Sequence, residues 1–492
     1  MADIVVVGGG VGGLCAAIRC ALAGHHVTVL ERNDVVGGKL GVCRRDGFSF
    51  DTGPSLLTLP HVFDEVLRLA DTTLAAELDL VRLNPQVRYH WVDGATLDAC
   101  DDPAQTEAAF ERFAPGSGAR WRAFDDRARS IWTVAERTFL AGSMDSPRQL
   151  LSRLRSPRDL LAIDPLRTLQ RAAAADFDDA RLQQWAGRYA TYSGSSPYRA
   201  PATLACIEHV ESAYGAWYPM GGLGQLRDAL VAAAERVGVV LRTGAEVVAI
   251  AADDRRVRGV RIGGDSEPAV LEADVVVANV DAVHLYRDLL PDRRVLRRVR
   301  RARPSGSGFV VLAGVHGRTE VTGGLAHHNV WFSPSYGREY DALDAGRASD
   351  EPTIYTCVSS VTDASQAPTG DENWFVLVNT PPGGSWDSAT TADYRDLVLR
   401  RLAERGVDLR SRLAFTETIT PADLASRYRA EGGSIYGTSS DGRRAAFVRP
   451  GNHGPRRGLY LVGGSSHPGG GLPLVAISGR IVSELIAEDG WT

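Results

Sequence analysis

The chain has very little lysine, cysteine or uninterrupted apolar sequence. Lys39 is its single lysine, so arginine carries almost all of the positive charge. A formal net charge of -5 excludes the basic surface with which nucleic-acid-binding proteins neutralise phosphates, so we expect no nucleic-acid partner. The six cysteines contain no CxxC pair and no spacing typical of metal ligands, which predicts reduced thiols and no metal site.

Long apolar segments are also missing. No stretch approaches the roughly 18 consecutive apolar residues of a membrane-spanning helix. The N-terminus lacks the basic leader and the apolar core of a signal peptide, because glycines interrupt its apolar run after Val7. We therefore predict a cytoplasmic protein. With 492 residues, 44% of them hydrophobic, the chain can form two or three domains, or one composite domain with insertions.

A dinucleotide-binding pattern of strand, glycine turn, helix and second strand occupies residues 3–31. Its glycines are Gly8, Gly10, Gly12 and Gly13. Gly8 allows a sharp turn, Gly10 lets a pyrophosphate approach the backbone, and Gly13 lets helix and strand pack closely. Glu31 closes the second strand, where a ribose hydroxyl would be bound. The alternative is a glycine-rich turn without a ligand, but the order of strand, helix and acid favours the nucleotide site.

A second glycine pair follows directly, beside the single lysine, at Gly37, Gly38 and Lys39. In a nicotinamide enzyme the chain would continue here with further strand and helix units. A glycine turn with a cation instead favours the longer cofactor FAD, because exposed amides and a positive charge can bind its pyrophosphate or its flavin. A plain surface turn is the alternative.

The rest of the chain divides by its periodicity. Residues 1–85, 212–292 and 440–492 alternate strand and helix patterns and predict one composite FAD-binding domain. Residues 100–210 have helical periodicity, and the strand-like runs of residues 293–439 predict a substrate subdomain. The expected fold class is therefore α/β, with a Rossmann-like FAD-binding domain, an inserted helical subdomain and a second, sheet-based subdomain.

The last segment of the sequence repeats the pattern of strand, glycine turn and helix found in the first. Residues 459–462 predict a strand, residues 463–473 form a glycine turn, and a helix is expected from Leu474. Two helices that both begin at glycine turns can face one dinucleotide. We therefore expect the N-terminal and C-terminal segments to lie together.

Arginine and leucine alternate irregularly in residues 146–171. Basic, leucine-rich helices can lie in the headgroup layer of a membrane with their apolar face among the acyl chains. The alternative is the solvated face of an ordinary helical subdomain. Pro147, Pro157 and Pro165 divide the stretch into short helices, so no long amphipathic helix is expected.

Several motifs together carry a family resemblance. They are the opening glycine motif with Glu31, the turn at residues 37–39, and residues 50–55, 218–222, 326–332, 352–370 and 463–473. Through them the chain resembles the carotenoid desaturases of the bacterial phytoene desaturase type, within the wider FAD-dependent amine oxidase fold. The match runs nearly end to end and is weakest between residues 100 and 200. The tail resembles branches that act on later acyclic or hydroxylated carotenoids, so phytoene is one of several candidate substrates.

The resemblance implies an FAD-dependent oxidoreductase of carotenoid biosynthesis. It would introduce C=C bonds into an acyclic polyene by passing hydride to the flavin and a proton to a weak base. Because the resulting cation is delocalised over the polyene, no strong base is required, and we name no catalytic residue. The candidate cofactor-binding residues are Gly8, Gly10, Gly12, Gly13, Glu31, Gly38, Lys39, Asp51, Gly53, Pro54, Ser55, Val247, Gly463, Gly464, His467, Pro468, Gly470, Leu472 and Pro473.

Three histidines and one aspartate also have possible roles. His327 and His328 are expected in a strand, on opposite faces and without neighbouring metal ligands, and a structural role is expected for each. By resemblance, His467 supports the loop that faces the flavin. Asp51 either anchors its loop beside the flavin or caps a turn.

The expected partners follow from the resemblance. They are an apolar polyene drawn from the bilayer, the membrane surface with which the enzyme would associate peripherally, and quinone or oxygen as electron acceptor. Two alternatives stay open. One is an FAD-dependent carotenoid oxygenase, a saturase or a natural-product flavin oxidase. The other is a non-catalytic, flavin-stabilised subunit that tethers a complex to the membrane.

Overall fold

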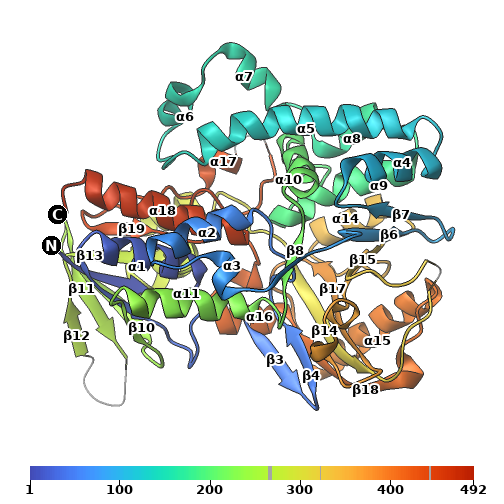
Figure 1. The fold of residues 1–492 in the computed structure, drawn as a ribbon. Helices are drawn as coiled ribbons and strands as arrows, with labels where there is room; N and C mark the ends of the chain where they lie inside the picture. Colours follow the sequence, from blue (N-terminus) through green and yellow to red (C-terminus); the bar gives the residue numbers. More distant parts are fainter. Residues whose placement is uncertain (264–268, 322, 443–444, 492) are drawn as a thin grey trace.

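The computed structural model describes residues 1–263, 269–321, 323–442 and 445–491 (Figure 1). A five-stranded parallel sheet forms its cofactor side, in the order β19-β13-β1-β2-β9. The strands are β1 (Asp3–Val7), β2 (His26–Leu30), β9 (Val240–Arg242), β13 (Val275–Ala278) and β19 (Leu459–Leu461). The central strands are short, valine-rich runs buried on both faces, as is typical of parallel sheets.

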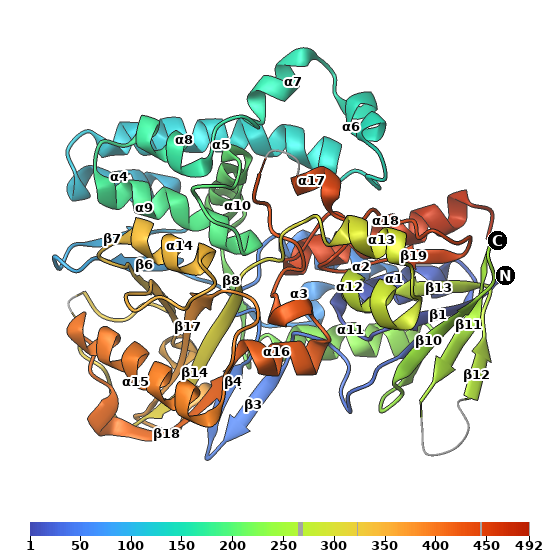
Figure 2. The same cartoon turned by 180° about the vertical axis from the view of Figure 1, so that it is seen from behind.

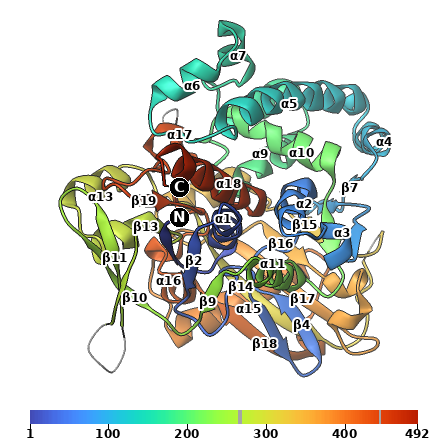
Figure 3. The ribbon, with the colours of Figure 1, turned by 60° about the vertical axis from the view of Figure 1, so that its left-hand side comes forward.

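Helices cover one face of this sheet, and a small antiparallel sheet covers the other (Figures 1 and 3). The helices are α1 (Val11–Leu22), α11 (Gly224–Arg236) and α18 (Leu472–Glu488). The small sheet consists of β10 (Val247–Ala252), β11 (Val257–Ile262) and β12 (Ala269–Glu272). α18 packs directly on α1, because Gly479 has no side chain; a Cβ there would lie 2.9 Å from Cys15 Cβ. The prediction that the two helices after the glycine turns lie together is confirmed.

A seven-stranded sheet forms the second half, in the order β18-β14-β17-β16-β15-β6-β7. Its strands are β6 (Val87–His90), β7 (Thr96–Ala99), β14 (Ser307–Val315), β15 (His328–Trp331), β16 (Ile354–Cys357), β17 (Glu372–Thr380) and β18 (Leu413–Ile419). β6 and β7 come from a segment that the sequence patterns assign to no subdomain, and β6 joins the sheet by pairing in parallel with β15. α15 (Ser388–Glu404) packs on one face of this sheet.

A helical layer lies above the seven-stranded sheet (Figure 2). It contains α4 (Pro103–Phe113), α5 (Ser117–Phe139), α8 (Leu169–Asp176), α9 (Ala180–Gly187) and α10 (Cys206–Tyr214), packed around buried aromatic rings. α6 (Pro147–Arg153) and α7 (Pro157–Ala162) project from it as an arm in all three views. Within the described ranges, no helix is both long and apolar enough to span a bilayer.

The remaining elements connect these layers. They are β3 (Val42–Arg45), β4 (Phe48–Asp51), α2 (Pro60–Leu69), α3 (Leu74–Glu77), β5 (Leu80–Arg82), η1 (Arg188–Ser193), η2 (Ala202–Ala205), β8 (Trp217–Pro219), α12 (Ala282–His284), η3 (Leu285–Leu289), α13 (Arg293–Val299), α14 (Tyr336–Asp344), η4 (Ser359–Val361), η5 (Ala364–Gln366), η6 (Arg410–Arg412), α16 (Pro421–Tyr428), η7 (Glu431–Gly433) and α17 (Ala445–Val448). The predicted α/β fold class, with a parallel sheet, an inserted helical layer and a second sheet, is confirmed.

Candidate functional site

One cavity of about 520 Å³ extends from the carboxyl ends of β1 and β2 to the seven-stranded sheet. The predicted cofactor-binding residues that line it are Gly8, Gly10, Gly12, Glu31, Gly38, Lys39, Gly53, Pro54, Ser55, Val247, Gly463, Gly464, Gly470, Leu472 and Pro473. The fold thus brings segments from both ends and the middle of the chain around one space. A crevice at the carboxyl ends of parallel strands is where nucleotides bind in this class of sheet.

The first glycine turn leaves bare backbone beside the cavity. Gly8 has a φ of +97°, and a Cβ there would lie 2.6 Å from the Asn279 carbonyl oxygen. A Cβ at Gly13 would lie 2.5 Å from the Gly8 carbonyl oxygen, so only glycine allows α1 to start this close to β1. Asn279 holds the turn by donating from Nδ2 to that oxygen at 2.9 Å. The residues present therefore fit a pyrophosphate bound at the N-terminus of α1.

Glu31 lines the same part of the cavity, directly after the end of β2. Its side chain is buried, and its carboxylate accepts hydrogen bonds from the Gly9 amide at 2.9 Å and the Asn33 amide at 2.9 Å. Each carboxylate oxygen has two lone pairs, so a ribose hydroxyl facing the cavity still finds an acceptor. This arrangement fits the predicted ribose contact.

Lys39 places a half-buried cation on the cavity wall. Burial lowers the pKa of its ammonium group to about 8, while the nearby Asp281 carboxylate opposes that shift. Its Nζ donates to the Ile435 carbonyl. Asp281 also lines the cavity, and burial raises the pKa of its carboxyl group. A lysine held here can neutralise part of a diphosphate, which fits FAD.

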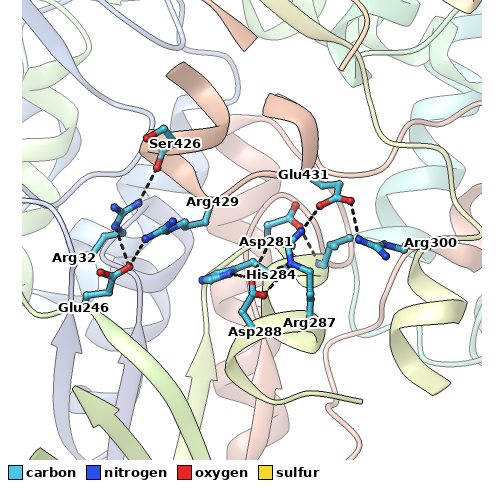
Figure 4. Close-up of polar contacts among 11 residues, drawn as sticks. Arg32, Glu246, Asp281, His284, Arg287, Asp288, Arg300, Ser426, Arg429 and Glu431 are labelled. Atoms are coloured by element: carbon cyan, nitrogen blue, oxygen red, sulfur yellow. Dashed lines mark hydrogen bonds and ion pairs between the residues drawn. The ribbon is translucent and has the colours of Figure 1, made fainter. Parts of the chain in front are cut away.

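Residues 421–433, which contain α16 and η7, line the cavity from the side opposite the glycine turn. Figure 4 shows the two groups of ion pairs that fasten this segment to the FAD-binding half. In one, Arg429 donates to Glu246 at 2.7 Å. In the other, Glu431 accepts from Arg287 at 2.8 Å. The segment is thus held in place by charges from outside its own subdomain.

Four predicted cofactor-binding residues do not line the cavity: Gly13, Asp51, His467 and Pro468. Asp51 accepts a hydrogen bond from the Leu223 amide at 2.9 Å, at the start of α11. Of its two predicted roles, this contact corresponds to the capping of a turn. Burial raises the pKa of its carboxyl group to about 6, against its hydrogen bonds with backbone amides. The His467 Nε2 lies 2.7 Å from the Phe139 carbonyl oxygen and so joins the C-terminal turn to the end of α5. These residues lie outside the cavity lining, and Asp51 and His467 hold neighbouring loops in place through hydrogen bonds.

The prediction that His327 and His328 point to opposite faces is wrong. His327 lies just before β15, and the two ring centroids are 4.5 Å apart. Cys357 of the neighbouring strand is close enough for the ligand atoms of the three side chains to lie within 4.8 Å of one another. Burial and the Asp51 charge raise the pKa of the Cys357 thiol well above its usual range, which disfavours the thiolate that a metal binds. The absence of a metal stays a prediction.

A polar part of the cavity wall contains three residues that are missing from the sequence-based site candidates: Tyr355, Arg188 and Tyr192. Ser55 Oγ lies 2.5 Å from the Tyr355 hydroxyl, which lies 2.8 Å from His328 Nδ1. Arg188 and Tyr192 of η1 line the same cavity. These residues come from three subdomains, so no local sequence pattern places them together.

Asn279 is also missing from the sequence-based candidates. Its place directly after a buried strand beside β1 could have identified it as a site residue.

His467 is expected to make stability depend on pH. Burial lowers the pKa of its imidazole from 6.5 to about 4, against hydrogen bonds to the Phe139 and Gly142 carbonyls. A lowered folded-state pKa contributes stability that is present above pH 6.5 and is lost as the pH falls through about 4. The free energy of unfolding of the wild type, minus that of His467→Gln, should therefore decrease by about 3 kcal/mol across this range. Urea unfolding at several pH values measures it, and a constant difference would contradict the assignment.

Comparison with known proteins identifies a family and relatives of similar sequence. The profile of the flavin containing amine oxidoreductases matches residues 11–487. A 4,4'-diapolycopene oxygenase from Methylomonas sp is 35% identical over 493 residues, which covers 99% of this chain and 98% of that protein. A 4,4'-diaponeurosporene oxygenase from Staphylococcus aureus (strain USA300) is 32% identical over 490 residues, covering 98% and 97%.

Solved structures agree with the fold. An oxidoreductase from Methanosarcina mazei is similar at a TM-score of 0.65 with 18% sequence identity, covering 98% of this chain and 100% of the other. A cyclohexylamine oxidase from Brevibacterium oxydans IH-35A gives a TM-score of 0.62 at 16% identity, covering 100% of both chains. At these identities, the likeness concerns the fold alone.

Proposed function

Because the chain belongs to the family of flavin containing amine oxidoreductases, we propose that it oxidises an acyclic carotenoid at the end of its polyene and introduces oxygen there. It is an FAD-dependent oxidoreductase, as predicted. The predicted resemblance to FAD-dependent carotenoid enzymes is confirmed by two relatives that match nearly the whole chain. Since the chain is an enzyme, the alternative of a non-catalytic tethering subunit is not retained.

The observation that carries the proposal is the continuity of the cavity. From the glycine turn, the same space reaches the apolar face of the seven-stranded sheet, where its wall includes Val310, Val330, Phe375 and Leu377. An apolar wall suits a polyene and keeps water away from it. When bound, the flavin supplies the hydride and oxygen chemistry. The chain's own residues then bind and orient the polyene.

Desaturation is the second candidate function. The motifs at residues 50–55 and 463–473 resemble those of desaturases, and hydride abstraction from a polyene requires no strong base. His328, the histidine joined to the cavity through Tyr355, is a poor base, because burial and the His327 charge lower its pKa well below its usual value. Such surroundings are compatible with desaturation. The relatives' names favour oxygenation.

We also propose that α6 and α7 dock the enzyme peripherally on an anionic membrane surface. Leu151 of α6 and Leu161 of α7 are 57% and 79% exposed, and Leu166, in the loop that follows α7, is 65% exposed. The exposed arginines beside them that form no ion pair with a described residue are Arg148, Arg155 and Arg158. Exposed leucines among uncompensated arginines match the acyl chains and acidic headgroups of a bilayer. The cytoplasmic location and a quinone or oxygen acceptor stay predictions.

The test of the proposed reaction is expression in a host supplied in turn with phytoene, neurosporene, lycopene, 4,4'-diapolycopene and hydroxylated acyclic carotenoids. Pigments are analysed by mass and absorption. We expect a gain of oxygen at the polyene end from one of them. A loss of two hydrogens with a longer absorption wavelength would establish desaturation and overturn oxygenation. Unchanged pigments, with flavin fully bound, would contradict both.

A further inference from the structure

Arg188 is a buried cation in the wall of the cavity. Its side chain lies at the start of η1 and the residue is only 6% exposed. No carboxylate of the described residues forms an ion pair with it within 4.0 Å. Its two terminal nitrogens instead donate to one acceptor, the Tyr192 hydroxyl, at 3.1 and 2.9 Å. A guanidinium group has five donors, and among the described residues none of those of Arg188 is paired with a carboxylate.

Three tyrosine rings surround the charge. The guanidinium carbon lies 5.2 Å from the ring centre of Tyr89, 5.3 Å from that of Tyr189 and 5.0 Å from that of Tyr192. The negative faces of aromatic rings stabilise a cation without accepting its hydrogen bonds. Glu211 balances the charge only indirectly, since it accepts a hydrogen bond from the Tyr192 hydroxyl. The cage thus holds a cation that lines the cavity and whose two terminal nitrogens share a single acceptor, the Tyr192 hydroxyl.

Other polar groups gather on the same cavity. Ser55 and Tyr355, whose hydroxyls are 2.5 Å apart, line it together with Arg188. Burial lowers the pKa of His328, which lies behind Tyr355, and the charges of His327 and Arg188 lower it further. The Arg188 charge also acts against the rise that burial causes in the pKa of Tyr355. We call Arg188, Tyr192, Tyr355 and Ser55, which line one cavity, the polar subsite. The neighbouring sheet wall carries no charge; it is formed by Val310, Val330, Phe375 and Leu377, with Ser307 and Asn379 as further uncharged polar residues.

We propose that the polar subsite binds the carbonyl oxygen at an oxidised end of the polyene, with Arg188 as the hydrogen-bond donor. This inference rests on the proposed function and specifies its substrate class: a polyene aldehyde is bound in preference to the corresponding hydrocarbon. A hydrocarbon end offers no acceptor and leaves the buried cation unsatisfied. A carbonyl end offers one acceptor, and the apolar wall holds the rest of the chain. Arg188 determines specificity in this role and takes no part in the chemical step.

The experiment compares a polyene aldehyde with a hydrocarbon of equal conjugation length, titrated into the purified, flavin-loaded enzyme. Quenching of tryptophan fluorescence gives the Kd of each. A charged hydrogen bond predicts that the wild type binds the aldehyde roughly 10- to 100-fold more tightly. A cation beside the carbonyl should also shift the absorption of the bound aldehyde to longer wavelength. Arg188→Met should lose both the preference and the shift and keep its affinity for the hydrocarbon.

Arg120→Met is the matched control. It makes the same substitution at an arginine of α5 that pairs with Asp178 and does not line the cavity, so the preference for the aldehyde should remain. If Arg188 only ties η1 to α10, Arg188→Met will weaken binding of both ligands alike or release flavin. A folded, flavin-loaded Arg188→Met that keeps the preference also overturns the inference. Wild type that binds neither polyene would instead contradict the proposed function.

Discussion

Gly10→Val is expected to yield a folded protein that retains no flavin. Gly10 lines the cavity at the start of α1, where the pyrophosphate would approach the backbone. Its φ of -73° suits valine, so the backbone is not strained. A Cβ would already lie 3.0 Å from Asn279 Nδ2, and the valine methyl groups would fill the space that the phosphates need. We expect flavin affinity to fall at least ~100-fold, about 2.7 kcal/mol.

The ratio of flavin to protein absorbance measures this, with circular dichroism as the check of folding. The matched control is Gly337→Val in α14, where the same side chain is added and the Cβ would lie 3.6 Å from the nearest atom, the Tyr198 hydroxyl oxygen. The control should keep its flavin. Stoichiometric flavin in a folded Gly10→Val would contradict the assignment of the first glycine turn as the pyrophosphate site.

Leu161→Glu combined with Leu166→Glu is expected to abolish binding to anionic vesicles. Leu161 is exposed on α7 and Leu166 in the loop that follows it. Burying one leucine in an apolar phase is worth about 1.5–3 kcal/mol, so the loss of two should weaken membrane partitioning by roughly 100-fold or more. The added carboxylates are also repelled by acidic headgroups. Sedimentation with vesicles of neutral and of anionic lipid measures the partition.

Val248→Glu combined with Val270→Glu is the matched control for this pair. It makes the same change of charge at two exposed apolar residues of the sheet β10–β12. The control should sediment like the wild type. If both double variants lose binding equally, overall charge and not the arm determines membrane association. If neither loses it, the arm is a solvated face, the alternative that the sequence leaves open.

The sequence predicts well those parts of the site that form locally. The turn from β1 into α1 and the turn before α18 each lie within one short segment, so glycine spacing and apolar runs determine them. The expected start of the last helix, Leu474, differs from the observed Leu472 because Pro473 is accommodated in the first turn of the helix. Local patterns are enough for the nucleotide half of the cavity.

The other half depends on contacts that no local pattern contains. β6 pairs with a strand more than 200 residues later. Arg188 and Tyr355 line one cavity only because the helical layer packs on the second sheet. The error at His327 has a different cause. Strict alternation of side chains applies only within a strand, and β15 begins one residue after it.

The close packing of α1 on α18 also has a consequence for biosynthesis. During synthesis the first glycine turn leaves the ribosome more than 400 residues before β19, the second glycine turn and α18. Until those emerge, the cofactor crevice lacks the wall formed by residues 463–473, and β13 and α1 lack β19 and α18 as neighbours. FAD can therefore be bound by both glycine turns only after α18 has been made, and its supply at that moment affects the yield of folded enzyme.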